Sequence, residues 1–225
     1  MSKAPIAVAL DGPDLTTISA WSMAVAPHVS TLKVGLETYL RDGEAAIDAV
    51  RKTDCGLFLD LKLHDIPNTV AGAAKSVVRY RPQFLTVHAL GGGEMVAAAV
   101  RELPETRVTA VTILTSMDEA ALRSIGIHDS ALEAAVRLAR LSVDAGARAI
   151  VCSPQEVAAI RAAVPREIVL ITPGVRPVGA DAGDQKRIAT PQQAIADGAD
   201  IVVIGRPITG APDPARAAAE IGASL

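Results

Sequence analysis

The stretch GLFLDLKLHDIPNTV, residues 56–70, decides the fold and raises the question of function. Its first eight residues are almost continuously apolar, which is typical of a buried parallel strand. Two charged residues, Asp60 and Lys62, nevertheless interrupt the run. Because they are two positions apart, a regular strand would point both to the same side. Burying a charge costs several kcal/mol unless an opposite charge compensates it, so we expect neighbouring strands to supply partners.

Seven similar apolar runs accompany this one along the 225 residues, and helical patterns separate them. The eight runs are residues 6–11, 31–35, 56–63, 83–89, 107–114, 148–153, 167–174 and 200–206. Eight strands that alternate with helices over this length predict a (β/α)8 TIM barrel, with a single domain over residues 1–225. An open, doubly wound sheet is the alternative, but no GxGxxG motif follows the first strand.

Two of the intervening segments place apolar residues at helical spacing, which predicts a buried face on each helix. The first set is Leu132, Val136, Ala139 and Val143, and the second is Val157, Ile160 and Val164.

The ends of the helices carry their own signals. SPQE at 153–156 and TPQQ at 190–193 each place a hydroxyl at the N-cap and a proline at the first helical position. DCG at 54–56, DAG at 144–146 and ADG at 196–198 each place a glycine just before a strand. We expect each of these glycines to take the left-handed conformation that ends a helix.

The composition excludes several classes of partner. The net charge is -3, no run of lysine and arginine stands out, and aromatic residues make up 2% of the chain, so we expect neither nucleic acid nor an anionic membrane as a partner. The two cysteines, Cys55 and Cys152, lie far apart and outside any CxxC motif, which fits a reducing compartment. The start of the chain has no signal-peptide pattern, and we expect a cytoplasmic protein.

Charged residues gather at the predicted carboxyl ends of the strands, where the active site of such a barrel lies. Asp11 ends the first strand, Lys33 lies on the second, and Asp60 and Lys62 lie on the third. If all four face the interior, they form an alternating array in which each charge compensates the next. Neighbouring carboxylates favour the charged form of Lys62, which suits it to proton donation and anion stabilisation rather than Schiff-base formation.

The last two strands predict a phosphate site. Gly205 and Arg206 follow the eighth strand, and Arg176 follows the seventh, where barrels often bind phosphate. The guanidinium of arginine suits phosphate oxygens. The long polar stretch 177–190 contains Gln185 and is predicted to be a lid or binding loop. The remaining strand ends carry His88, Thr115 with Ser116, and Pro173.

The motifs together resemble one known family. DLKLHDIPNT at 60–69 is similar to the D-x-K-x-x-D signature of orotidine 5′-monophosphate decarboxylases. KVGLE, LTSM, TPGVRP, GDQKRIATP and VIGRPIT, which follow in order along the chain, resemble the bacterial form of that family. The resemblance implies decarboxylation of orotidine 5′-monophosphate to UMP in pyrimidine synthesis, by a homodimeric barrel that needs no metal and no organic cofactor.

The resemblance also implies roles for the acid and lysine residues. Lys62 would donate the proton to C6, and Asp60 would lie near the departing carboxylate. Lys33 would pair with the ribose and the acidic residues, and Asp11 would bind a ribose hydroxyl. Asp65 would complete the catalytic set from the partner subunit.

Further residues would bind the substrate. Thr69 would reach across the dimer interface with Asp65, while Thr115 and Ser116 would approach the pyrimidine. The remaining substrate-binding residues, most of them at the phosphate, would be Pro173, Arg176, Gln185, Gly205 and Arg206.

Two other functions compete with this interpretation. The first is that of metal-dependent relatives on the same barrel, such as a hexulose phosphate synthase. The resemblance to them would imply a magnesium site that includes an acidic residue on the second strand. That position holds Lys33 here, and Mg²⁺ prefers oxygen ligands. A barrel that only senses a nucleotide phosphate would not require the acid and lysine array.

Overall fold

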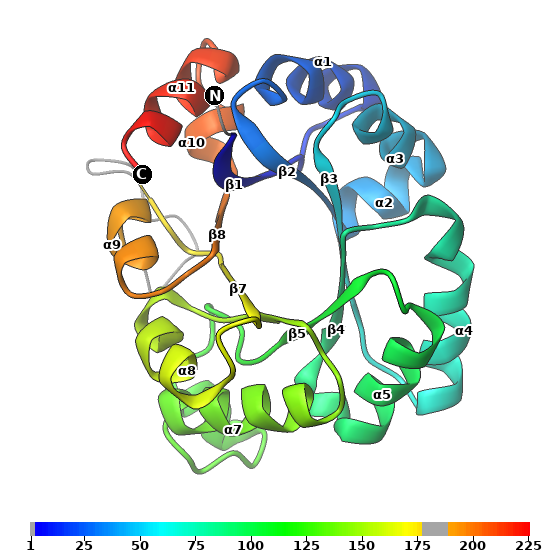
Figure 1. The fold of residues 1–225 in the computed structure, drawn as a ribbon, viewed down its shortest axis with the longest axis vertical. Helices are drawn as coiled ribbons and strands as arrows, with labels where there is room; N and C mark the ends of the chain where they lie inside the picture. Colours follow the sequence, from blue (N-terminus) through cyan, green and yellow to red (C-terminus); the bar gives the residue numbers. More distant parts are fainter. Residues whose placement is uncertain (1–2, 177–188) are drawn as a thin grey trace.

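Eight parallel strands close into a barrel in the order β1-β2-β3-β4-β5-β6-β7-β8 in the computed structural model, which describes residues 3–176 and 189–225 (Figure 1). The predicted (β/α)8 barrel is thereby confirmed. The strands are β1 Ala4–Ala9, β2 Val29–Gly35, β3 Gly56–Leu63, β4 Phe84–His88, β5 Arg107–Val111, β6 Ala149–Val151, β7 Val169–Thr172 and β8 Ile201–Ile204.

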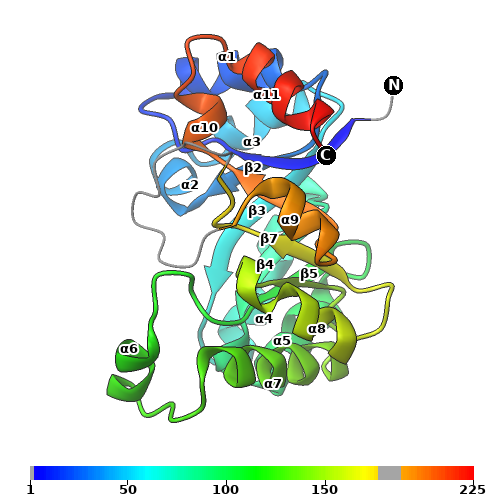
Figure 2. The same ribbon diagram turned by 90° about the vertical axis from the view of Figure 1, so that its left-hand side faces the viewer.

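Helices surround the ring of strands, and α6 stands away from it on a longer excursion of the chain (Figure 2). The α-helices are α1 Leu15–Val25, α2 Leu36–Asp42, α3 Glu44–Arg51, α4 Pro67–Val77, α5 Gly93–Glu102, α6 Glu119–Ser124, α7 Ala131–Asp144, α8 Val157–Ala163, α9 Pro191–Ala196, α10 Arg206–Thr209 and α11 Pro214–Ala223. Short 3-10 helices are η1 Val78–Tyr80, η2 Ala89–Gly91 and η3 Pro154–Glu156. Among the described residues, none of the helices has the length and apolar character needed to cross a membrane.

The predicted helix starts are confirmed. Around Pro154, the Ser153 backbone N–H donates a hydrogen bond to the Glu156 carboxylate at 3.0 Å, although the first turn is the 3-10 helix η3 and α8 follows it directly. The Thr190 hydroxyl accepts a hydrogen bond from the backbone N–H of Gln193 at the start of α9. These caps satisfy backbone donors that a helix start otherwise leaves without partners.

Two of the three predicted helix-ending glycines behave as expected. Gly146 and Gly198 have φ angles of 95° and 111°, in the region that glycine enters without strain. The prediction for Gly56 is wrong, because this residue is the first of β3 and pairs with Thr31. A Cβ there would lie 1.7 Å from the Oε1 of Gln83, so a larger residue would require the Gln83 amide to move.

The prediction for the buried face of α7 is only partly correct. Ala139 is buried and Val136 and Val143 are half-buried against the core, but Leu132 is exposed. The helix turns mostly small side chains inward, and its main neighbours are α5, α8 and the 3-10 helices η2 and η3. Its buried residues are Ala134, Ala135, Leu138, Ala139 and Ser142. The prediction for the following helix is confirmed, since Val157, Ile160 and Val164 are all buried.

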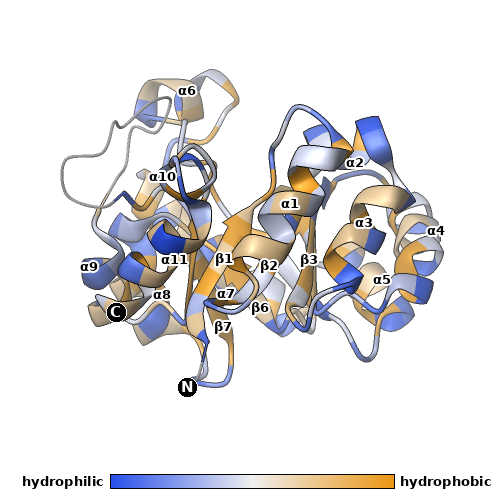
Figure 3. Ribbon diagram, turned by 90° about the horizontal axis from the view of Figure 1, so that it is seen from above, coloured by the Kyte–Doolittle hydropathy of each residue, from blue (hydrophilic) through white to orange (hydrophobic). Residues whose placement is uncertain are grey.

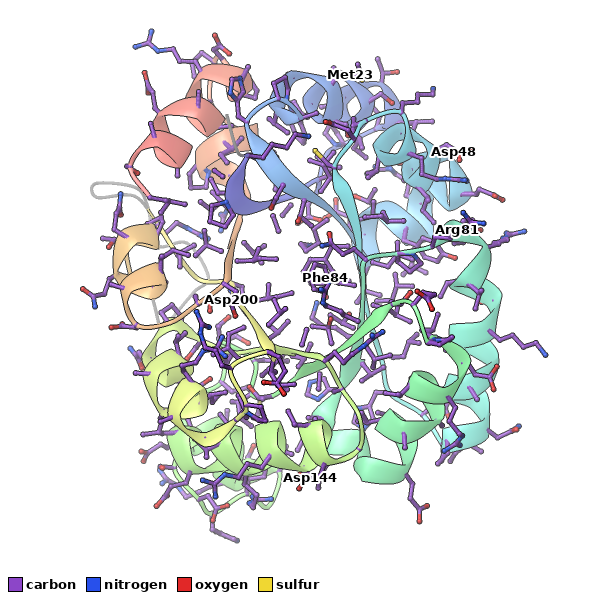
Figure 4. All side chains as sticks on the ribbon, in the orientation of Figure 1. Met23, Asp48, Arg81, Phe84, Asp144 and Asp200 are labelled. Carbon is purple, nitrogen blue, oxygen red and sulfur yellow. The ribbon has the colours of Figure 1, made fainter. Side chains whose placement is uncertain are left out.

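The interior of the barrel is filled by side chains below the site. Phe58 and Phe84 meet edge to face with ring centroids 5.6 Å apart, and Figure 4 shows Phe84 inside the ring of strands. Small and branched residues from the other strands pack around this pair. A second and larger core lies between the strands and the helices, and the apolar colouring of the strands in Figure 3 marks it. Because side chains fill the interior, space for a ligand remains at the carboxyl ends of the strands.

Two glycines that follow helix ends give a matched test of backbone conformation. Gly126 and Gly146 have φ angles of 83° and 95°, but a Cβ on Gly126 meets open space whereas one on Gly146 comes within 3.2 Å of Val100. We expect Gly126→Ala to lower the free energy of unfolding by about 1 kcal/mol through backbone strain. Gly146→Ala should cost at least about 1 kcal/mol more, because it adds overpacking.

Urea unfolding followed by circular dichroism at one fixed chain concentration measures both values. Equal costs for the two variants, or a larger cost for Gly126→Ala, would contradict this account of Gly146.

Candidate active site

A cavity of about 700 Å³ opens at the carboxyl ends of the strands. Residues from β1, β2, β3, β5, β6, β7 and β8 or from the segments that follow them line it. Ten of the residues predicted from the sequence are in its wall: Asp11, Lys33, Asp60, Lys62, Thr115, Ser116, Pro173, Arg176, Gly205 and Arg206. The fold therefore brings together residues that are almost 200 positions apart.

Four charged side chains alternate along one wall of this cavity. The Asp60 carboxylate lies between two ammonium groups, with its Oδ1 2.8 Å from Lys62 Nζ and its Oδ2 3.3 Å from Lys33 Nζ. Lys33 Nζ is also 3.7 Å from Asp11 Oδ1. The structure thus forms the expected Asp11–Lys33–Asp60–Lys62 array, from three adjacent strands.

The array decides the charge state of its buried members. Burial opposes ionisation of Asp60, but Lys33 and Lys62 outweigh it and hold the pKa of this carboxyl below its usual value. Burial likewise opposes the charge of Lys33, yet Asp60 and Asp11 raise the pKa of its ammonium. Both groups therefore carry charge throughout the neutral range, so the wall of the cavity is a fixed arrangement of alternating charges.

Space for the Lys33 ammonium comes from a glycine at the end of the same strand. A Cβ on Gly35 would lie 2.8 Å from Lys33 Nζ and 3.0 Å from Asp11 Oδ1. Any larger residue at this position would press on both charged groups. The glycine in the sequence KVG therefore serves the array rather than a turn.

The strand that carries Asp60 and Lys62 is not regular. Leu59 pairs with Leu85 and Leu63 pairs with Val87, so β3 advances four residues where β4 advances two. Lys62 lies in this bulge with a φ angle of 48°, a conformation that costs a non-glycine residue about 1 kcal/mol or more. Both side chains reach the cavity, but through a bulge rather than through the simple alternation that the sequence suggested.

His88, at the end of β4, does not line the cavity. Its ring stacks on that of His64 with centroids 5.3 Å apart. Burial, together with the nearby His64 and Lys62, lowers the pKa of His88. The His88 ring is therefore neutral at neutral pH.

The other side of the cavity is formed by β5 to β8 and carries polar and cationic groups. Thr115 and Ser116 lie beyond β5, and Pro173 and Arg176 lie beyond β7. Gly205 caps α10 and directly precedes Arg206. The two guanidinium groups make this the part of the wall suited to an anion such as phosphate.

Two of the predicted residues that the structure describes are not in the wall. Asp65 and Thr69 are exposed and lie outside the cavity of their own chain. Gln185 and most of the predicted lid, 177–190, fall outside the described residues.

The residues of the cavity wall that the sequence interpretation did not select include Glu37, Cys152 and Thr209. Glu37 is in the first turn of α2, directly after the strand that carries Lys33. Burial raises the pKa of the Cys152 thiol to about 12, so it stays protonated at neutral pH. Glu37 and Thr209 are the last residues of the stretches KVGLE and VIGRPIT, but the sequence interpretation gave neither of them a role, and Cys152 lies outside the quoted stretches.

Comparison with known proteins gives one consistent result. Residues 4–221 match the family described as orotidine 5'-phosphate decarboxylase / HUMPS. A protein of Thermobifida fusca called orotidine 5'-phosphate decarboxylase is 65% identical over 99% of this chain and 96% of its own. A protein of the same name from Anaeromyxobacter sp. is 55% identical over 98% and 97% of the two chains.

Solved structures agree with the sequence comparisons. The crystal structure of orotidine 5'-phosphate decarboxylase from Lactobacillus acidophilus superposes with a TM-score of 0.84 at 33% identity, and the match covers 97% of each chain. Taken with the match over nearly its whole length, this likeness shows that the chain belongs to the orotidine 5'-phosphate decarboxylase / HUMPS family.

Proposed function

We propose that this protein decarboxylates orotidine 5′-monophosphate to UMP and CO₂ in pyrimidine biosynthesis. The names of its relatives support this assignment. The observation that carries it is the alternating array of Asp11, Lys33, Asp60 and Lys62 in the wall of one cavity. This array offers an ammonium group, held by a carboxylate, to the substrate atom that must receive a proton.

The charges orient the substrate. Its phosphate belongs with Arg176 and Arg206, because the carboxylates of Asp11 and Asp60 repel a dianion from the other wall. The pyrimidine then lies toward the array, between it and the side of the cavity that carries Thr115 and Ser116. Binding of the phosphate, remote from the reacting carbon, helps to hold the pyrimidine in this position.

The chemical step uses the array directly. The bond between C6 and the carboxylate carbon breaks, CO₂ leaves, and the electron pair stays on C6. The Lys62 ammonium stabilises this negative charge and then transfers a proton to C6, after which the neutral amine regains a proton from water. The fixed charge of Asp60 repels the substrate carboxylate and ceases to do so once CO₂ departs.

The family description also covers HUMPS proteins, so the metal-dependent alternative needs a physical argument. A magnesium site of that kind requires an oxygen ligand on the second strand, and this chain holds the ammonium of Lys33 there, 3.3 Å from Asp60. A cation at this position repels Mg²⁺ and occupies the carboxylate that would bind it. The arrangement favours the metal-free decarboxylation of orotidine 5′-monophosphate.

We also propose that the protein is a homodimer. Apolar side chains are exposed beyond the carboxyl ends of β2, β3 and β4, namely Leu36, Leu40, Ile66 and Leu90. Leu40 leaves 79% of its surface exposed. Asp65 and Thr69 belong to the same region and are themselves exposed. A second copy of this chain would cover these residues and receive Asp65 and Thr69 at its own cavity.

Loss of the ultraviolet absorbance of the orotate group tests the proposed reaction. We expect the purified protein to remove this absorbance from orotidine 5′-monophosphate in excess EDTA, with UMP as the product, because no step requires a metal. Activity that appears only with Mg²⁺ would support the metal-dependent alternative. No change in either condition would overturn the proposed function.

Mixing two inactive variants tests the homodimer and the role of Asp65. Asp65→Ala and Lys62→Ala chains should each be almost inactive alone. When they are unfolded and refolded together, we expect about one quarter of the wild-type activity per site, because half of the dimers are hybrids and each hybrid has one intact site.

Asp60→Ala mixed with Lys62→Ala is the matched control. Both residues belong to the same chain's cavity, so no combination restores an intact site. Recovery in this control, or no recovery with Asp65→Ala, would contradict the proposed exchange of residues across the interface.

A further inference from the structure

The bulge in β3 is held by a side chain that belongs to neither the array nor the cavity wall. Thr86 is in the middle of β4, is fully buried, and does not line the cavity. The Lys62 backbone N–H donates a hydrogen bond to the Thr86 hydroxyl oxygen at 2.8 Å. That hydroxyl in turn lies 3.1 Å from Asp60 Oδ1.

The direction of each hydrogen bond follows from the chemistry of the partners. A backbone N–H only donates, so the Thr86 oxygen accepts from Lys62. An ionised carboxylate only accepts, and Asp60 is held ionised by its two lysines, so the hydroxyl proton points to Asp60. The Thr86 hydroxyl therefore accepts a hydrogen bond from the Lys62 backbone and donates one to the Asp60 carboxylate, so it connects the two ends of the bulge.

Both bonds act where the strand is strained. Lys62 adopts a φ angle of 48° in the segment where the pairing of β3 with β4 shifts by two residues. The Thr86 hydroxyl supplies the partner for an N–H that would otherwise be left unsatisfied at this shift. The Asp60 oxygen that receives the hydroxyl is also the one that receives Lys62 Nζ at 2.8 Å. Thr86 thereby fixes both the backbone of Lys62 and the anion that holds its ammonium.

We propose that Thr86 is a positioning residue for the proton donor, whose hydroxyl holds the Lys62 backbone and the Asp60 carboxylate in the arrangement that directs the Lys62 ammonium into the cavity. This inference rests on the proposed decarboxylation. It assigns Thr86 an effect on the chemical step rather than on binding, because the side chain does not reach the cavity.

Thr86→Val tests the proposal, since it keeps the shape of the side chain and removes the hydroxyl. We expect kcat to fall roughly 10- to 100-fold, as for a proton donor displaced by a fraction of an ångström to 1 Å. KM and the dissociation constant for UMP should stay within about twofold, because the groups that bind the nucleotide are unchanged. Thr86→Ser, which keeps the hydroxyl, should retain at least about one third of the wild-type kcat.

Thr109→Val is the matched control. Thr109 pairs with Thr86 on the neighbouring strand β5, is equally buried, and donates its hydroxyl to the backbone carbonyl of Arg107. The same substitution there removes a buried hydroxyl that has no contact with the array, so kcat should be unchanged. If Thr86→Val does not fold, Thr86→Cys replaces it, because its thiol is a weaker donor and acceptor.

The wild-type protein, assayed alongside, decides the proposed function separately from this inference. With an active wild type, a normal kcat for Thr86→Val would overturn the positioning role. The role would also be overturned if Thr86→Val lost UMP affinity as much as kcat, or if Thr86→Ser lost as much kcat as Thr86→Val. Thr86 would then contribute to the fold alone. Loss of kcat that appears in Thr86→Val, recovers in Thr86→Ser and is absent from Thr109→Val supports it.

Discussion

The Asp60 carboxylate, held between the ammonium groups of Lys33 and Lys62, is the interaction on which the site depends. Without Asp60, two lysines would face one another in a largely buried setting, where like charges repel strongly. Without either lysine, the carboxylate would be buried with too little compensation, a loss that costs about 3–5 kcal/mol in comparable pairs. The array is therefore stable only as a set.

The barrel provides the conditions that such a set requires. Parallel strands bring their carboxyl ends to one side, so residues from β1, β2 and β3 meet without a long loop. Phe58 and Phe84 fill the interior beneath them and keep that region apolar. Charges held by a rigid, poorly hydrated support need not reorganise during the reaction, which is the main source of electrostatic stabilisation in enzymes.

Much of this arrangement is predictable from the sequence, because its causes are local. Apolar runs rich in branched residues mark the strands, and the charges that interrupt or end them identify the cavity wall. The bulge at Lys62 is not predictable in this way, since it depends on how β3 pairs with β4. Thr86 was missed for the same reason: in the sequence it is one more β-branched residue in a strand.

Errors elsewhere have equally specific causes. Branched residues suggested the buried face of α7, whereas small residues make up most of the side that is fully buried. Gly56 followed a helix and resembled a helix end, although it is the first residue of β3. The proposed roles of Asp65 and Thr69 in a partner's cavity are a different case: they rest on the family resemblance, because the fold of one chain places both residues outside its own cavity.

Turnover and UMP affinity of the Lys62→Ala variant test the central claim most directly. The exposed Lys52 provides a control of the same substitution outside the site. If Lys62 supplies the proton and the positive charge that C6 requires, Lys62→Ala binds UMP but shows no detectable decarboxylation, and Lys52→Ala behaves as the wild type. Near-normal turnover by Lys62→Ala would contradict the role of the array in the reaction.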